Sequence, residues 1–531
     1  MKNERIVGSA LAEVLPETDK FWFQIPHLLH LNCILLVPLL SSSVAGYDGS
    51  LMNGLQSLTQ WKEYFDSPAG ALLGLVNAAQ SIGSVLALPV VGSLADRFGR
   101  KAVLLSGLLG IIVATILQAT ATTLAQFVVS RAIVGAAGMF SAQPSPLLLA
   151  ELSYPTHRGK YTSAYWTLYY LGAILASWTT FGTQGYDSTW AWRIPTILQA
   201  GFPAVQLAFF CFLPESPRWS VRILPPNPSI PANLFRLVSK DRDQEALRIL
   251  ARYHAGGDVQ SPLVLREMAE IVDTIKLEQE AKRTGWSTLV ATPGNRKRLC
   301  IAVALGAMAQ WNGIGVVSYY LTLVLDTVGI TDPFLQTLIN GLLQIFNFIV
   351  ALTAAFLVDR LGRRTLFTFS GVVMLLSYIV WTACSAVNDA TGSRPAGIVV
   401  IVCLFVFYLG YDCAYTPLLM SYPTEIFPFS IRSKGLTCEL LSIYGSLVIA
   451  AFVNPIGLDT IGWRYYIVFC CFLAFFLAIT YFTFPETRGH SLEEIAEVFD
   501  GPRIATDAEM LDSKAKKEDD KEHIEEKIDE V

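Results

Sequence analysis

The segments DRFGRK (96–101) and DRLGRR (359–364) are near copies of one another, 263 residues apart. Each follows a long apolar run, and each carries an acid together with several basic residues. Two further pairs recur in the same order, at offsets of 274 and 271 residues: Glu151 and Arg158 with Glu425 and Arg432, and PESPR (214–218) with PETR (485–488). Three ordered pairs at similar offsets are hard to obtain by chance, so the chain is predicted to consist of two related halves.

The apolar runs between these motifs have the length of membrane spans. A helix rises 1.5 Å per residue, so about 20 apolar residues cross the hydrocarbon core of a bilayer. Only 16% of the residues are charged and 53% are hydrophobic, whereas soluble domains carry about 25% charged residues. The runs fall at 29–52, 70–92, 102–122, 126–149, 161–183, 194–213, 298–325, 334–357, 366–387, 397–420, 436–454 and 464–484. They predict an all-α membrane protein with about twelve transmembrane helices in two six-helix halves.

The distribution of charge sets the expected boundaries and orientation. Basic residues concentrate in the even-numbered short loops, so by the positive-inside bias both termini face the cytoplasm. The interval after the sixth run is rich in charge, and its apolar spacing indicates short amphipathic helices. The tail alternates Lys with Asp and Glu and is expected to be partly disordered. The expected parts are a cytoplasmic N-terminal segment (1–28), a first bundle (29–213), a cytoplasmic linker (214–297), a second bundle (298–485) and a cytoplasmic tail (486–531).

Several classes of function are not indicated by the sequence. The nine cysteines lie in or beside apolar runs and are expected to be small buried hydrophobes. No Cys/His spacing indicates a metal site, and no phosphate loop or nucleophile–base set is visible. No basic patch indicates nucleic acid. We therefore expect no enzyme, cofactor or metal, and the sequence does not indicate an oligomeric state.

Two related bundles predict a cavity between them near the middle of the membrane. The repeated charged motifs all lie on the cytoplasmic side, where acid–arginine pairs across the halves are expected to latch the inner side shut. Exposed pairs are worth about 0–1 kcal/mol each, which suits a latch that must reopen. The alternative is that these charges only anchor helix ends. The expected gate residues are Arg97, Glu151, Arg158, Glu215, Arg363, Glu425, Arg432 and Glu486.

Charged residues inside the apolar runs require a partner or a function, because each costs about 2.5–3.5 kcal/mol at the centre of a helix. Asp48 lies in the first run and Arg131 in the fourth, and an ion pair between them is one interpretation. Asp412 lies inside the tenth run, where it either faces a solute or a second proton path or pairs within the bundle. Glu439, near the inner end of the eleventh run, is expected to meet a basic residue at the cytoplasmic rim.

The motifs resemble those of a known family. DRFGRK, DRLGRR, ELSYPTHRGK (151–160), PESPRW (214–219), PTEIFPFSIRSKG (423–435) and PETRGHSLEEI (485–495) are similar to the sugar porter family of the major facilitator superfamily. The resemblance runs from about residue 40 to residue 500. It implies the major facilitator fold, a sugar as the solute and alternating access as the mechanism. It also implies that Asp48 carries a proton under the control of Arg131, as in proton-coupled members.

The resemblance assigns a substrate site but departs from the hexose pattern. In hexose porters the seventh helix resembles QQ-x-x-G-I-N-x-x-x-YY, and here it reads AQWNGIGVVSYY (309–320). Gln310 is kept, whereas Ala309, Gly315, Trp166 and Met420 replace polar or aromatic sugar contacts. The form is similar to fungal lactose and cellodextrin permeases, which favours a disaccharide or glycoside. The expected substrate-binding residues are Gln310, Asn312, Asn347, Trp166, Trp311 and Tyr319.

The sequence therefore favours a multi-pass secondary transporter of the cell membrane. Its expected partners are a sugar-like solute, protons and the lipid bilayer. Carboxamides both donate and accept hydrogen bonds, as sugar hydroxyl groups do, and aromatic rings offer flat apolar faces to sugar C–H groups. Two alternatives keep the same fold: a transporter or exporter of another metabolite, and a sugar sensor that does not transport.

Overall fold

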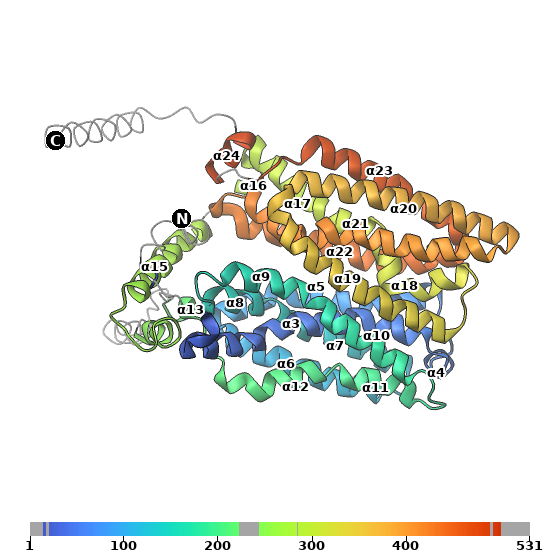
Figure 1. The fold of residues 1–531 in the computed structure, drawn as a ribbon, viewed down its shortest axis with the longest axis horizontal. Coiled ribbons are helices and arrows are strands. Elements are labelled where there is room, and N and C mark those ends of the chain that lie inside the picture. The colour runs from blue at the N-terminus through green and yellow to red at the C-terminus, as the bar shows by residue number, and fades with distance from the viewer. Residues whose placement is uncertain (1–13, 17–20, 222–243, 284, 489–491, 501–531) are drawn as a thin grey trace.

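The first half is a bundle of helices. The computed structural model describes residues 14–16, 21–221, 244–283, 285–488 and 492–500, and within these ranges it contains helices and no β-strand. The bundle of the first half, coloured blue to green, lies beside that of the second half (Figure 1). Its elements are η1 (Trp22–Gln24), α3 (Pro26–Ser57), α4 (Thr59–Tyr64), α5 (Gly70–Phe98), α6 (Arg100–Ala119), α7 (Leu124–Ala142), α8 (Pro144–Leu152), α9 (Arg158–Thr167), α10 (Tyr169–Thr183), α11 (Trp190–Leu198), α12 (Gly201–Phe209) and η2 (Phe210–Phe212).

The second half repeats this arrangement after a polar linker. The linker contains α13 (Pro217–Val221), a helical stretch at 244–254, α15 (Pro262–Arg283) and α16 (Thr288–Ala291). The elements of the second bundle are α17 (Pro293–Trp311), α18 (Ile314–Thr327), α19 (Pro333–Leu361), α20 (Arg363–Thr391), α21 (Arg394–Ile426), α22 (Phe429–Ile461), η3 (Gly462–Arg464) and α23 (Tyr465–Thr483), followed by α24 (Leu492–Asp500).

The helices have the surface of membrane spans. Ten stretches of the described chain are long and apolar enough to cross a bilayer. The longest of them contains both α22 and α23, and the broken helix formed by α9 and α10 adds one more, which makes twelve crossings in the described chain. Large apolar side chains such as Leu86 and Phe482 point outward, 71% and 81% exposed. A helix that is hydrophobic on all faces belongs in lipid, and the predicted all-α membrane fold is confirmed.

Glycines bring helices of the first half into close contact. A Cβ at Gly46 on α3 would lie 1.8 Å from the carbonyl oxygen of Tyr169, and a Cβ at Gly172 on α10 would lie 1.8 Å from that of Ser43. Small residues are the usual means by which membrane helices approach backbone to backbone. This contact fixes the start of α10 against the middle of α3.

Helices four, five and seven of the membrane bundle are broken. Pro144 begins α8 after α7, and the fifth helix is interrupted at Leu168. The seventh is interrupted at Gly313, which has φ +97° and whose Cβ, if present, would lie 2.2 Å from the hydroxyl of Tyr378. Only glycine suits this combination of a left-handed backbone and close packing. The breaks in helices five and seven lie beside the central cavity described below.

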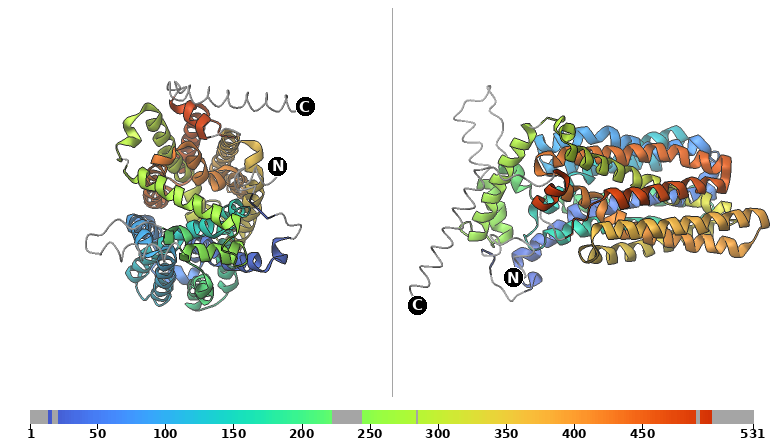
Figure 2. Two further views of the ribbon diagram at one scale, coloured as in Figure 1. Left: turned by 90° about the vertical axis from the view of Figure 1, so that its left-hand side faces the viewer. Right: turned by 90° about the horizontal axis from the view of Figure 1, so that it is seen from above.

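Two pairs of helices form the most extensive packing between the halves. α5 of the first half packs against α22 of the second, and α10 packs against α19. The linker helices lie across one end of the bundles, as the end-on view in Figure 2 shows. There His254 Nδ1 lies 2.7 Å from Glu267 of α15, and its Nε2 lies 3.1 Å from the Leu152 carbonyl oxygen of α8. The linker is thus tied to the end of the fourth membrane helix.

Candidate functional site

A cavity of about 260 Å³ lies between the halves. Residues from both bundles line it, and seven of the sixteen are aromatic. Aromatic rings next to a few amide and hydroxyl groups are typical of pockets for small polar molecules. The lining residues are Gly49, Ser50, Trp166, Tyr169, Tyr170, Ala173, Gln310, Ile314, Ser318, Tyr319, Gln344, Tyr408, Tyr411, Tyr415, Thr416 and Leu419.

Three of the expected substrate residues line this cavity: Gln310, Trp166 and Tyr319. Gln310 lies on α17, just before the break in the seventh helix. Trp166 lies on the α9 side of the break in the fifth helix and is 40% exposed. Tyr319 points into the cavity, whereas its neighbour Tyr320 points away and donates a hydrogen bond of 2.5 Å to the Ala451 carbonyl oxygen.

The other three expected substrate residues are not among those that line it. Asn312 follows α17, and its Oδ1 accepts a 3.0 Å hydrogen bond from the backbone amide of Ile314, which caps α18. Trp311 packs on Phe472, with ring centroids 5.7 Å apart. Asn347 is fully buried on α19, and neither of its amide atoms has a hydrogen-bond partner in the described chain. A buried amide without partners is costly, so Asn347 remains a candidate for contact with water or a ligand.

Among the cavity residues that sequence reasoning missed are Gln344, Tyr408, Tyr411 and Tyr415. The three tyrosines lie on α21 at spacings of three and four residues, which places them on one helical face. Gln344 lies one turn before Asn347 on α19. In each case the sequence contains polar or aromatic residues at helical spacing, which places them on one helix face. This spacing did not show that the face points into the cavity.

Asp48 and Arg131 form a buried ion pair within the first half. The two residues are 4% and 1% exposed, and Arg131 Nη1 lies 3.3 Å from Asp48 Oδ1. Asp48 directly precedes Gly49 and Ser50, two lining residues of the cavity. A Cβ at Gly49 would lie 2.4 Å from the Tyr169 hydroxyl, so this glycine allows the tyrosine to lie against α3 next to the acid.

Further polar groups hold this pair. Gln199 donates a 3.0 Å hydrogen bond to Asp48 Oδ1. Arg131 donates to the Val76 carbonyl oxygen at 3.1 Å and to Gln80 Oε1 at 2.8 Å. Gln80 and Gln199 are polar residues inside apolar runs, which is a signal of function or pairing that sequence reasoning did not use.

Asp412 lies on α21 beside the cavity and is fully buried. Its Oδ1 accepts hydrogen bonds from the hydroxyls of Tyr170 at 2.5 Å and Thr416 at 2.7 Å. Tyr170 belongs to α10 in the first half, so this contact joins the two halves. Its Oδ2 has no hydrogen-bond partner among the described residues.

The prediction for Glu439 is wrong in this structure. Glu439 on α22 is fully buried, and neither carboxylate oxygen has a hydrogen-bond partner in the part of the chain that the structure describes. It therefore does not meet a basic residue at the rim. The register of the eleventh helix turns it inward, which hydropathy does not reveal.

The two halves are hydrogen-bonded to each other at the end where α3 finishes. Asn53 donates to the carbonyl oxygens of Val317 and Ser318 at 3.2 and 2.6 Å and accepts from the Leu321 amide at 3.3 Å. Gln56 donates to the Tyr319 carbonyl oxygen at 3.0 Å. Ser57 of α3 is hydrogen-bonded to Thr322 of α18 at 3.1 Å. Thr337 of α19 donates to Gln184, which follows α10, at 3.0 Å. This end of the cavity is therefore closed by contacts across the halves.

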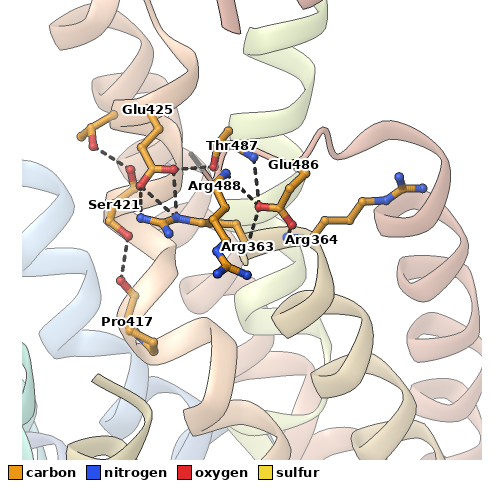
Figure 3. Close-up of polar contacts among 9 residues, drawn as sticks. Arg363, Arg364, Pro417, Ser421, Glu425, Glu486, Thr487 and Arg488 are labelled. Carbon is orange, nitrogen blue, oxygen red and sulfur yellow. Dashed lines mark hydrogen bonds and ion pairs between the residues drawn. The ribbon is translucent and has the colours of Figure 1, made fainter. Parts of the chain in front are cut away.

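The charged motifs of the second half form a compact cluster at the opposite end (Figure 3). Arg363 donates from Nη2 and Nε to Glu425 at 2.9 and 3.2 Å. Thr487 also donates to Glu425, at 2.5 Å. Glu486 accepts from the backbone amides of Arg363 at 2.8 Å and Arg364 at 3.1 Å, which caps the start of α20.

The first half repeats this cluster residue by residue. Arg100 Nε lies 3.5 Å from Glu151, which also accepts a hydrogen bond from Ser216. Glu215 accepts from the amides of Arg100 and Lys101 at 3.0 and 3.2 Å and caps α6. The repeat offset of 263 residues maps Arg363 onto Arg100, so this arginine could have been identified from the sequence in place of Arg97.

The remaining gate residues have local contacts. The Arg97 guanidinium lies 5.3 Å from the Phe98 ring centroid. Arg158 begins α9, and Arg432 donates to the Phe427 carbonyl oxygen at 3.2 Å. The Arg100–Glu151 and Arg363–Glu425 pairs each join elements of one half rather than the two halves, because each motif sits beside its own bundle. They fix helix ends within a half, and a latch across the halves stays a prediction.

Comparisons with known proteins agree with this architecture. The family model "Sugar (and other) transporter" matches residues 34–225 and 228–499. The MFS glucose transporter mfs1 of Aspergillus flavus is 29% identical over 489 residues, which cover 87% of this chain and 88% of that protein. The inward-open structure of the xylose transporter XylE from E. coli has a TM-score of 0.70 at 21% identity, over 88% of this chain and 100% of that one.

A second XylE structure, described as a proton:xylose symporter bound to 6-bromo-6-deoxy-D-glucose, has a TM-score of 0.68 at 21% identity, over 88% of this chain and 99% of that one. At these identities the solved structures show the fold, whereas the family model covers most of the chain and its motifs. The protein is thus a multi-pass membrane transporter and not an enzyme, and it belongs to the sugar (and other) transporter family of the major facilitator superfamily.

Proposed function

We propose that the protein carries a sugar across the cell membrane by alternating access, coupled to protons, with both termini in the cytoplasm. The single observation that carries this proposal is the cavity between the halves, which is lined from both bundles and closed at one end by contacts between them. Trp166 borders the cavity from α9, before the break in the fifth helix, and is 40% exposed. Rocking of one bundle against the other would expose such a site to each side in turn.

The lining chemistry suits a sugar. Gln310 and Gln344 present amides, which donate and accept hydrogen bonds as hydroxyl groups do. Trp166, Tyr169 and Tyr411 present rings to which the C–H faces of a sugar can pack. The finer proposal, that the solute is a disaccharide or glycoside rather than a free hexose, is supported by the seventh-helix motif AQWNGIGVVSYY (309–320), which resembles that of fungal lactose and cellodextrin permeases.

Asp48 is the proposed proton carrier. Burial favours its neutral form, whereas Arg131 at 3.3 Å and the Gln199 amide favour its charged form. A movement that changes the separation of Asp48 and Arg131 therefore changes how tightly the proton is held. One charge moving through 100 mV supplies about 2.3 kcal/mol, enough for roughly fifty-fold accumulation.

The proposal is tested by uptake of labelled glucose, lactose and cellobiose into cells that lack their own sugar carriers. We expect accumulation above the outside concentration, and we expect a protonophore to abolish it. Asp48→Asn should abolish accumulation while exchange of sugar across the membrane remains, because the cavity is intact but no proton is bound.

The matched control is Asp389→Asn, which makes the same change at an exposed site beside Trp463, away from the cavity. Uphill uptake that persists in Asp48→Asn would reject Asp48 as the carrier. If none of the three sugars enters, the substrate proposal fails, and a carrier for another metabolite becomes the better interpretation.

A further inference from the structure

Asp412 differs from Asp48 in one decisive respect. Both are buried acids beside the same cavity, but Asp48 has Arg131 as a countercharge. The described residues give Asp412 no basic partner, and its Oδ1 accepts only from the hydroxyls of Tyr170 and Thr416. Its Oδ2 has no hydrogen-bond partner in the described part of the chain. A carboxylate without a countercharge inside a bilayer is strongly disfavoured, and such a group neutralises by binding a proton.

The groups around Asp412 support this protonation state. Among the described residues, the titratable groups near it are Tyr170 on α10 and Tyr408, Tyr411 and Cys413 on α21. Each of them is neutral or negative when it titrates, so none supplies a positive charge. A protonated Asp412 keeps Oδ1 as the carbonyl oxygen for both hydroxyl donors and carries the proton on Oδ2.

The position of Asp412 links this proton to the transport cycle. The Tyr170 hydroxyl comes from the first half and Asp412 from the second, so the 2.5 Å hydrogen bond forms only while these faces are together. Tyr170 and Thr416 both line the cavity. Separation of the halves at this contact would bring water to the carboxyl, which removes the penalty on the charged form.

We propose that Asp412 is a second proton-carrying site, which is protonated while its hydrogen bond with Tyr170 joins the halves and deprotonated when they separate there. The step is a simple acid dissociation: the O–H bond on Oδ2 breaks, cavity water takes the proton, and a hydrated carboxylate remains. This inference rests on the proposed proton symport and extends it from one carboxyl to two.

Infrared spectroscopy of the purified full-length protein tests the protonation state without a substrate. We expect a carbonyl stretch of a protonated carboxylic acid near neutral pH that is lost in Asp412→Asn and kept in Asp389→Asn. Tyr170→Phe should shift this band to higher frequency, because the carbonyl oxygen loses a donor. This variant also keeps the test usable if Asp412→Asn does not fold.

Glu439 is another buried acid that has no basic partner among the described residues, so Glu439→Gln serves to assign its own band. If Asp412→Asn leaves the spectrum unchanged, or Tyr170→Phe leaves the band in place, the protonated carboxyl is not the one bound to Tyr170 and the proposal is overturned.

Proton release is tested in proteoliposomes with whichever of glucose, lactose and cellobiose gives the greatest uptake. Because each carboxyl carries one proton, the ratio of protons to sugar should fall from about two to about one in Asp412→Asn. An unchanged ratio with intact uptake would show that Asp412 keeps its proton throughout, which overturns this inference alone. A wild-type protein that moves sugar without protons would instead contradict the proposed symport.

Discussion

Gly99 and Gly362 are the glycines of the repeated charged motif, and their surroundings allow only glycine at these positions. Their φ values are +96° and +88°, a region that only glycine adopts readily at the extended ψ found here. A Cβ at Gly99 would lie 2.3 Å from Glu215 Oε2, and one at Gly362 would lie 2.7 Å from Glu486 Oε2. The glycine in each motif is thus required both by the backbone turn and by the approach of a glutamate.

At the same scale, Gln310→Ala tests the cavity. Gln310 is an amide from α17 in a lining that is mostly aromatic, so its loss should remove one or two hydrogen bonds to the sugar, worth about 0.5–1.5 kcal/mol each. We expect roughly a two- to 150-fold increase in the sugar concentration that gives half-maximal uptake. Uptake as a function of concentration measures it.

Gln126→Ala is the control for this change. Gln126 lies near the start of α7, and its contacts are local, to Thr122 and Leu117. An unaltered concentration dependence in Gln310→Ala would mean that the solute binds elsewhere.

At the scale of the elements, the charged motifs cap the N-termini of helices. Burial acts to raise the pKa of Glu486, but hydrogen bonds from the backbone amides of Arg488, Arg363, Arg364 and Thr487 outweigh it and lower the pKa below 4.5. An anion at a helix N-terminus is favoured by the unpaired amides and the helix dipole. Glu486 therefore stabilises the start of α20 as a carboxylate.

Glu215 occupies the same position in the first half, with the opposite result. There burial outweighs the hydrogen bonds from Ser216, Lys101 and Arg100 and raises the pKa of Glu215 above 4.5. The two caps are alike in geometry but differ in how much water reaches the carboxyl, so they should respond differently to acid.

Glu486→Gln should lower the free energy of unfolding by about 1 kcal/mol at pH 7. Because the pKa of Glu486 is lowered on folding, its stabilisation is present above 4.5 and is lost as the pH falls through the folded value. The difference from wild type should therefore shrink in acid below pH 4.5. Thermal unfolding of the detergent-purified protein across pH measures this.

Glu215→Gln is the paired comparison. Because the pKa of Glu215 is raised on folding, its carboxylate is disfavoured in the folded state, so this variant should destabilise the protein less at pH 7 than Glu486→Gln does, and wild type should gain stability relative to it as the pH falls through the folded pKa. The same pH dependence for both variants would contradict the contrast between the two caps.

At the scale of the whole molecule, contacts between the halves decide which side of the cavity is open. Asn53 alone makes three hydrogen bonds to α18. Their loss in Asn53→Ala should weaken the closed end by about 1–3 kcal/mol and favour the alternative state roughly five- to 150-fold.

The measurement is the labelling of Gln310→Cys by a membrane-impermeant thiol reagent added outside intact cells. The background should lack the nine native cysteines. We expect labelling to be faster when Asn53→Ala is also present. Equal rates with and without Asn53→Ala would show that these hydrogen bonds do not hold the gate.

Much of the fold was predictable because membrane helices can be recognised from their apolar composition. An apolar run of about 20 residues must be helical in lipid, since every backbone group must be bonded within the segment. The repeated motifs then divided the runs into halves. The breaks at Leu168 and Gly313 were not predicted, because each lies inside a single long run of mostly apolar residues, 161–183 and 298–325.

The site was predicted in part. Asp48 and Arg131 stood out because charged residues in apolar runs are conspicuous, whereas Gln310, Trp166 and Tyr319 were expected from the resemblance to sugar porters. Hydropathy does not state which face of a helix points to lipid, to a neighbour or to a cavity. Asn312 illustrates the difference, since its side chain caps α18 rather than lining the cavity.

The sequence by itself determined the helical membrane fold, the duplication and the family, because those depend on local composition and on motifs with fixed spacing. Only the tertiary structure decided that the charged motifs pair within each half and that Asp412 meets Tyr170 across the halves. Those contacts join residues as far as 242 positions apart. They depend on the rotation and tilt of whole helices, which the packing of the two bundles fixes and no local pattern records.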